Sequence, residues 1–390
     1  MPHYMNEDRE LIVSTVREFV ENEVKPVARE IDTSDVFPLE LFHRCGELGY
    51  TNINVPKEFG GSEIDLTTFS LIIEEISKES ATLGMCLIAH AGLAATAVNY
   101  MGSDEQKAKW LVPMAQGTSV GAYCMTETTG LAERSMWSCR AVQDGDDWVI
   151  NGKKIFCTNI EVSDYFVVLA VTGDTQPLVT PPSTLFMVEK DTPGFSIGQI
   201  EDKVGWRGSS TGILNFDEVR VPAQNMLGPL HMGATCAQTA LFEMPSAGAC
   251  ALGIAEAAYE MAFNFALNRT VGDGQPYYMY FESMRTRLQE MKLDLEAMRS
   301  FIYNVTTMID NGEIDAPIAY MMKAYCFRRA ESICSQAIDL HGGLGVVIDT
   351  GVERLWRDAK VGMIGGGQYD NLLDLAGKLT GMAALAKQRA

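Results

Sequence analysis

The spacing of apolar residues changes twice along this chain of 390 residues. From Glu7 to about Gly117 apolar residues recur at helical intervals, and Ser103-Asp104-Glu105-Gln106 has the form of a helix capping box. From about Gly121 to Pro222 short β-rich runs alternate with turn residues. After Gly228 helical spacing returns. The order predicts a mainly α fold with a central β domain.

We place the domain boundaries at residues 1–120, 121–228 and 229–390. Within the β segment, Asn151-Gly152 stands between two β-rich runs, a dipeptide typical of a two-residue hairpin turn. In the last segment we expect one helix from Ala249 to Asn268, with an apolar stripe along it. The chain shows no internal repeat and no low-complexity linker.

The composition of the chain argues against some binding partners and indicates a cellular compartment. Hydrophobic residues make up 47% of the chain, enough for a large core, and 51 acidic against 31 basic residues give a net charge of −20. This charge argues against nucleic acid or an anionic membrane as a partner. The N-terminus is charged and amphipathic, so we expect neither export nor membrane spanning. The nine cysteines contain no CxxC pair and indicate reduced core thiols in a cytoplasmic protein.

Searches for local catalytic motifs find little. The chain has no GxSxG, Walker loop or strand-linked GxGxxG. Its five histidines show no metal-ligand spacing, so we expect no metal site. The stretch His341-Gly342-Gly343-Leu344-Gly345 would let a backbone approach a planar ligand or phosphate closely, although a tight turn between helices explains it equally well.

Six segments in order resemble the signature stretches of the acyl-CoA dehydrogenases, and the resemblance covers essentially the whole chain. They are VPKEFGG (55–61), YCMTE (123–127), INGKKIFCTN (150–159), VGWRGSSTGILNFDEVRVP (204–222), LHGGLG (340–345) and RDAK (357–360). The resemblance implies an N-terminal helical domain, a middle β-barrel-like domain and a C-terminal four-helix bundle. It also implies FAD bound between the β domain and the bundle, and a homotetramer or homodimer.

The reaction of this family needs a base and a flavin: a carboxylate removes a proton from the carbon alpha to a thioester, and the beta carbon gives a hydride to flavin N5. In many relatives the base is a Glu six residues after the Lys of RDAK, but here Gly366 occupies that position. A second subgroup, resembling isovaleryl-CoA and long-chain acyl-CoA dehydrogenases, carries its Glu ten positions before a bundle Gly. Glu243 precedes Gly253 by that interval, so the resemblance implies that Glu243 is the base.

Without the resemblance, Glu243 is a lone acid in the apolar run ALFEMP, and a partly exposed side chain or one paired with a distant Arg would explain it. With the base on the bundle, the glycines from Gly365 to Gly367 leave room beside the reacting carbons. This favours a branched, cyclic or otherwise unusual acyl group.

The resemblance also assigns binding residues position by position. The FAD contacts it implies are Tyr123, Met125, Thr126, Phe156, Thr158, Arg269, Glu282, Asp339, Gly342, Gly343, Gln368 and Asp370. The substrate contacts are Ala132, Leu241, Met244, Gly365 and Gly366. Several differ from the family pattern: Phe156 replaces the usual Trp, Ala132 a Ser, Leu241 a common Asp, and Met244 the usual Arg.

The partners that the resemblance implies are an acyl-CoA substrate, an electron-transfer flavoprotein and further copies of this chain. We expect a tetramer, because Arg269 would reach a neighbour's FAD pyrophosphate and because Met321, Met322, Tyr325 and Phe327 indicate a buried partner surface. Two alternatives stay open. One is the reverse reaction, a flavin-dependent enoyl-CoA reductase. The other is a diverged non-redox or non-CoA member of the fold.

Overall fold

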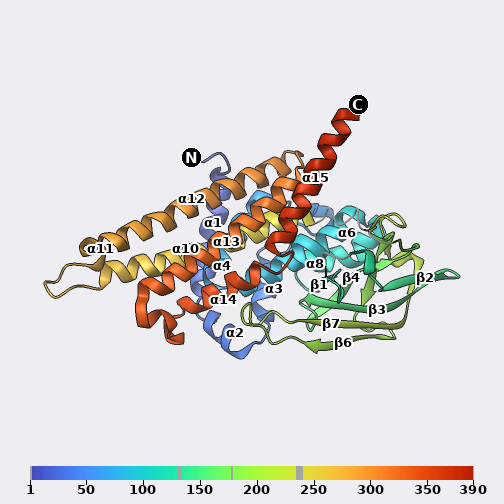
Figure 1. Ribbon diagram of the computed structural model, residues 1–390. Coiled ribbons are helices and arrows are strands. Elements are labelled where there is room, and N and C mark those ends of the chain that lie inside the picture. The colour runs from blue at the N-terminus through green and yellow to red at the C-terminus, as the bar shows by residue number, and fades with distance from the viewer. Residues whose placement is uncertain (1, 131–133, 177–178, 234–239, 390) are drawn as a thin grey trace.

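The computed structural model describes residues 2–130, 134–176, 179–233 and 240–389. Helices from both ends of the chain pack together, and the strands form a separate body at one end of this helical mass (Figure 1). The predicted mainly α fold with a central β domain is confirmed. The predicted domain boundaries stay predictions.

The N-terminal unit is helical throughout, with turns of 3₁₀ and π-helix between its α-helices. Its elements are α1 (Glu7–Phe19), η1 (Val20–Val24), α2 (Ala28–Ser34), α3 (Leu39–Glu47), η2 (Lys57–Phe59), α4 (Leu66–Glu79), α5 (Ala81–Leu87), η3 (Ile88–Ala95), α6 (Thr96–Met101), α7 (Asp104–Gln106), η4 (Lys107–Leu111) and α8 (Val112–Ala115). The predicted capping box is confirmed: the Ser103 hydroxyl accepts from the Gln106 N–H, and the Gln106 side chain accepts from the Ser103 N–H.

The β domain is one eight-stranded sheet in the order β6-β7-β3-β2-β4-β5-β8, with β1 paired in parallel to β4. Its elements are β1 (Val120–Cys124), η5 (Arg134–Met136), β2 (Arg140–Asp144), β3 (Asp147–Thr158), β4 (Ser163–Val171), β5 (Ser183–Glu189), β6 (Phe195–Ile200), β7 (Thr211–Pro222), η6 (Ala223–Asn225) and β8 (Met226–Leu227).

The predicted hairpin at Asn151-Gly152 is wrong, because both residues lie inside the continuous strand β3. The turn falls instead between Asp144 and Asp147, which face each other in the β2–β3 register. At Gly152 the β3–β7 register shifts, and a β-carbon there would lie 2.6 Å from the Cys139 Cα. This glycine therefore serves a bulge and a close backbone approach rather than a turn.

The C-terminal unit is a bundle of long helices with short connections. Its elements are α10 (Ala240–Asn268), α11 (Tyr277–Tyr280), α12 (Glu282–Asp310), α13 (Ala316–His341), η8 (Gly342–Val346), η9 (Ile348–Thr350), α14 (Val352–Gly362) and α15 (Tyr369–Arg389). Helix α10 begins nine residues before the predicted Ala249 and contains Pro245. Tertiary packing explains this extension, because its small residues lie against α4 and α13 and are fully buried.

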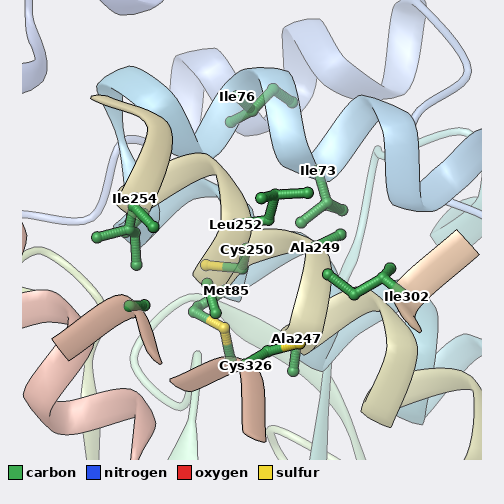
Figure 2. Packing of buried hydrophobic residues seen from close by; sticks show 14 of the residues in the cluster. Ile73, Ile76, Met85, Ala247, Ala249, Cys250, Leu252, Ile254, Ile302 and Cys326 are labelled. Atoms are coloured by element: carbon green, nitrogen blue, oxygen red, sulfur yellow. The ribbon is translucent and has the colours of Figure 1, made fainter. Parts of the chain in front are cut away.

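Small side chains let α10 approach its neighbours closely. Figure 2 shows Ala247, Ala249 and Cys250 of α10 among side chains that include Ile73 and Ile302. A β-carbon on Gly253 would overlap the Glu74 carbonyl oxygen, so the backbones of α10 and α4 pack directly on one another there. The N-terminal helices and the bundle thus share one hydrophobic core.

The segment Ala81–Met101 is long and apolar enough to cross a membrane, yet 94% of its most apolar window is buried within the protein. One other expectation needs correction. Met322 and Phe327 are fully buried within this chain, so they do not indicate a partner surface, whereas Met321 is exposed. The eight described cysteines are free and buried, as predicted; Cys236 lies outside the described residues.

Candidate active site

Glu243 lies in the first turn of α10, and its side chain is only 6% exposed. Its Oε1 accepts a hydrogen bond of 2.9 Å from the ammonium of Lys323, which is 2% exposed. The same ammonium donates to the carbonyl oxygen of Gly365 at 3.0 Å. Helices α10 and α13 and the loop after α14 therefore meet at one buried ion pair.

The glycine loop lies directly against this ion pair. A β-carbon placed on Gly366 would overlap both Glu243 Oε1 and Lys323 Nζ. Gly366 also has φ of 64°, a left-handed conformation that suits glycine, and it is exposed to solvent. The Glu243 carboxylate thus occupies the space that a side chain at position 366 would fill, and Gly366 has no side chain to compete for it.

The loop is held in place by a tryptophan and a buried acid. A β-carbon on Gly365 would lie 2.8 Å from the Trp206 ring, and the backbone N–H of Trp206 donates to Asp358 Oδ1 at 2.6 Å. Burial raises the pKa of Asp358 to about 6, although Arg354 and the hydrogen bond oppose this shift. The RDAK segment, which contains Asp358, therefore anchors the loop rather than supplying chemistry.

One further titratable group lies in the electrostatic neighbourhood of Glu243. Burial raises the pKa of Tyr320, the charge of Arg134 lowers it, and the charge of Glu243 raises it. Tyr320 precedes Lys323 by three positions on α13, so both residues fall on one side of the helix.

The sequence reading missed Lys323. It identified a lone acid in an apolar run and considered an exposed site or a distant Arg as the structural explanation, and the partner is instead a buried lysine. A signal was present: Lys323 is itself a lone cation in the apolar run AYMMKAYCF. A buried acid and a buried base that each lack a local partner are candidates to pair with one another.

The predicted substrate residues fall into three groups. Gly365 and Gly366 lie beside the carboxylate, as described above. Leu241 and Met244 are buried in the hydrophobic core, 5% and 4% exposed, next to Glu243 on α10. Ala132 lies outside the described residues.

The predicted FAD residues form two separate groups of five, and the remaining pair, Gln368 and Asp370, lies apart from both. The first is on the β domain: Tyr123 belongs to β1, Met125 and Thr126 follow it, and Phe156 and Thr158 belong to β3. Phe156 is 62% exposed and has φ of 51°, which is rare for a bulky residue. The backbone therefore presents an aromatic ring to an open face, and this geometry fits a planar ligand such as a flavin.

The second group is at the far end of the bundle, where α10 and α13 end and α12 begins. Arg269, Glu282, Asp339, Gly342 and Gly343 are all exposed there. The Arg269 Nε donates to the Tyr277 hydroxyl at 3.2 Å, and a β-carbon on Gly343 would meet nothing within 4 Å. This end lies away from the β domain, so one chain does not bring the two groups together (Figure 1). Gln368 and Asp370 lie where α15 begins.

The fold defines the class of protein: an enzyme-like α–β–α chain with a buried carboxylate between two bundle helices and a glycine loop. Family models agree with this class along nearly the whole sequence. Residues 6–118 match the acyl-CoA dehydrogenase N-terminal domain, residues 122–219 the middle domain and residues 231–378 the C-terminal domain. This chain therefore belongs to the acyl-CoA dehydrogenase family, whose members are FAD-dependent oxidoreductases.

Individual relatives are similar over nearly their full length. The chain is 37% identical to a short-chain specific acyl-CoA dehydrogenase of Clostridium acetobutylicum, over 93% of this chain and 94% of the relative. It is 33% identical to a 3-(aryl)acrylate reductase of Clostridium sporogenes, over 92% and 94%. It also matches, with a TM-score of 0.93 and 32% identity over 97% and 99% of the chains, a structure from a study of the electron transferring flavoprotein of Acidaminococcus fermentans and flavin-based electron bifurcation.

Proposed function

We propose that Glu243 is the base that removes the alpha proton of an acyl-CoA thioester. The observation that carries this proposal is the overlap between a β-carbon on Gly366 and Glu243 Oε1, because it brings the bundle acid to the place left empty in the loop. The carboxylate is also buried, and the neighbouring Gly366 is exposed to solvent. Such a site favours proton transfer, since water competes poorly for the base.

The atoms of the reaction balance with one residue and one cofactor. The bond between the alpha carbon and its hydrogen breaks, the proton goes to the Glu243 carboxylate, and the electron pair becomes the new carbon–carbon double bond. FAD, when bound, supplies the acceptor for the hydride that leaves the beta carbon. Lys323 gives up no atom in this step and remains hydrogen-bonded beside the carboxyl group.

We further propose that the acyl group is branched, cyclic or otherwise unusual in shape. Gly365, Gly366 and Gly367 contribute no side-chain bulk beside Glu243, and Gly367 with φ of 118° has a backbone conformation that suits glycine. The name of the Clostridium acetobutylicum relative favours a short chain. A compact, short acyl group satisfies both observations.

The test is anaerobic reduction of the bound flavin by a panel of thioesters: butyryl-, isovaleryl-, cyclohexanecarbonyl- and octanoyl-CoA. We expect the compact branched or cyclic thioesters to bleach the flavin band fastest. The Glu243→Gln variant should keep FAD but lose about 10³-fold or more in reduction rate. The exposed Glu313→Gln is the matched control and should reduce at the wild-type rate. Wild-type reduction by Glu243→Gln would disprove the role of this base.

The reverse direction is a second candidate function, favoured by the reductase name of the Clostridium sporogenes relative. An active site that stabilises one transition state serves both directions, so the driving force decides. Reduced protein mixed anaerobically with an enoyl-CoA should regain its flavin band if the reductase reaction is physiological. A reduced flavin that stays colourless with every enoyl-CoA of the panel would leave the dehydrogenase as the function.

The separation of the two predicted FAD groups supports a homo-oligomer, and we propose a tetramer built as a dimer of dimers. Each FAD would then lie on the β domain of one subunit and reach the Arg269 end of another, where a guanidinium suits a pyrophosphate. Exposed apolar residues at that end, including Met279, Tyr280 and Val346, fit an interface. Light scattering should give about four times 42.8 kDa, and Arg269→Ala should weaken FAD binding.

We also propose that the protein is a soluble cytoplasmic enzyme that passes its electrons to an electron-transfer flavoprotein. The net charge of −20 supports a soluble protein, and the study behind the matched structure supports the electron partner. Catalytic turnover with an added electron-transfer flavoprotein tests the second point. A purified protein that is colourless and takes up no FAD would favour the diverged non-redox scaffold instead.

A further inference from the structure

The most informative group that the reaction leaves unused is the ammonium of Lys323. It is one of the largest fully buried side chains of the described protein, at 1% exposure for the residue. Burying an ammonium is costly unless it is paired and hydrogen-bonded. A buried lysine whose partner is the proposed base therefore needs a reason beyond packing.

The two oxygens of the Glu243 carboxylate differ in their hydrogen bonds. Lys323 Nζ contacts Glu243 Oε1 at 2.9 Å and the Gly365 oxygen at 3.0 Å, so it ties the base to the glycine loop. Within the described ranges, no hydrogen bond engages Glu243 Oε2. One oxygen of the carboxylate is thus held and the other is left to accept a proton.

We propose that Lys323 is the positioning residue of the base: its ammonium fixes Glu243 Oε1 against the Gly365 carbonyl, so that Oε2 receives the alpha proton. The same ammonium lies at hydrogen-bond distance from both groups, so it restricts the orientation of the carboxylate relative to the loop. This inference rests on the proposed role of Glu243.

The charged groups around Glu243 are few among the residues that the structure describes. From α13 come Lys323 and Tyr320, and Arg134 influences Tyr320. From η3, Gly92 packs on the Glu243 backbone, and the nearby His90 is hydrogen-bonded through both ring nitrogens. Burial lowers the pKa of His90 to about 4, so it stays neutral near pH 7. The loop from Gly365 to Gly367 contributes backbone only.

The experiment is the pH profile of single-turnover flavin reduction in the Lys323→Met holoprotein, which has a similar apolar volume without the charge. This change removes a positive charge 2.9 Å from the proposed base, so we expect the acid limb of the rate profile to move up by about 1–3 pH units. At a pH below the shifted limb, the variant should reduce its flavin roughly tenfold more slowly than the wild type for each pH unit of the shift. The rate should recover as pH rises. A purely structural lysine would change stability and leave the limb in place.

The control is Lys78→Met, because Lys78 also pairs with acids inside the helical core, 3.1 Å from Glu75 and 3.0 Å from Glu256, but away from the site. It should lower the melting temperature and leave the pH profile unchanged. Lys323→Gln keeps a hydrogen-bond donor but lacks the charge, and it serves as the second variant if Lys323→Met does not fold. Its acid limb should move in the same direction.

Three results separate the hypotheses. An unmoved acid limb in whichever Lys323 variant holds FAD, together with an inactive Glu243→Gln, overturns the positioning role and leaves the base intact. A fully active Glu243→Gln overturns the proposed function itself. If neither Lys323 variant folds with FAD, the ammonium is a folding determinant and the positioning role is rejected.

Discussion

Two buried lysine–glutamate pairs in this protein differ in how completely their carboxylates are bonded. In the β domain, Lys154 Nζ donates to Glu127 at 2.8 Å and to the Met125 oxygen, and the Glu127 oxygens also accept from Ser138 and Cys139. In the bundle, Glu243 receives only the Lys323 bond within the described residues. The side chains are about equally buried, at 0% and 4% against 2% and 6%.

Burial alone therefore does not distinguish a structural acid from a chemical one. A carboxylate with both oxygens bonded is stabilised as an anion and has little capacity to accept a proton. A carboxylate with one oxygen held is oriented and still has an acceptor. Its neighbours differ as well, because Glu127 accepts from the backbone N–H groups of Ser138 and Cys139 just before β2, whereas Glu243 faces an exposed glycine with no side chain.

The largest expected effect comes from breaking the pair of Lys154 and Glu127, whose carboxylate oxygens are both hydrogen-bonded. Glu127→Ala leaves the fully buried Lys154 ammonium without its charge partner, so we expect a loss of about 3–5 kcal/mol in the free energy of unfolding. Denaturant unfolding measures this loss. The control is Glu47→Ala, which removes an exposed pair with Arg44 and should cost at most about 1 kcal/mol. Equal losses in the two variants would contradict the comparison.

The second prediction moves the acid from position 243 to position 366. If positions 243 and 366 serve the same reacting carbon, Glu243→Ala/Gly366→Glu should regain roughly 10–100-fold in flavin reduction over Glu243→Ala alone, within the usual contribution of a base. The regain stays incomplete because Glu must adopt the left-handed conformation of Gly366. The same reduction assay measures it. No regain in a folded double variant that binds FAD would mean that the loop does not approach the reacting carbon.

Two glycine substitutions compare the loop with an exposed helix. Gly366→Ala places a β-carbon against the ion pair at φ of 64°, so we expect it to cost at least about 1–2 kcal/mol in stability and to slow reduction. Gly377→Ala on α15 meets nothing within 4 Å and should be neutral or stabilising by up to about 1 kcal/mol. Thermal unfolding of the two variants compares them directly. A harmless Gly366→Ala would contradict the tight contact.

The smallest expected effect concerns Asp358. Because burial raises its pKa to about 6 in the folded protein, above the unfolded value, its contribution to stability is complete below about pH 4 and is lost as pH rises through 6. Asp358→Asn should remove about 1 kcal/mol of the stability change between pH 5 and 7. The exposed Asp374→Asn is the control and should leave the pH dependence unchanged. Denaturant unfolding at several pH values measures both.

Local patterns predicted the order of helical and β segments and the capping box at Ser103, because spacing and capping residues act within a few positions. Gly152 and the start of α10 were misread because contacts distant in sequence decide them: the Cys139 backbone restricts the former, and packing against α4 extends the latter. Likewise the partner of Glu243 lies 80 residues away on another helix. The family resemblance could propose the acid, but only the fold could bring Lys323 to it.

The most direct measurement of the central claim compares Glu243→Gln with Glu127→Gln in one assay: the rate of anaerobic flavin reduction per bound FAD, by the same thioester. Each change removes a charge beside a buried lysine and keeps the shape of the side chain. The predicted result is that Glu243→Gln binds FAD and loses about 10³-fold or more in rate, while Glu127→Gln loses stability and keeps its rate per flavin. A wild-type rate in Glu243→Gln, or an equal loss in Glu127→Gln, would contradict the account.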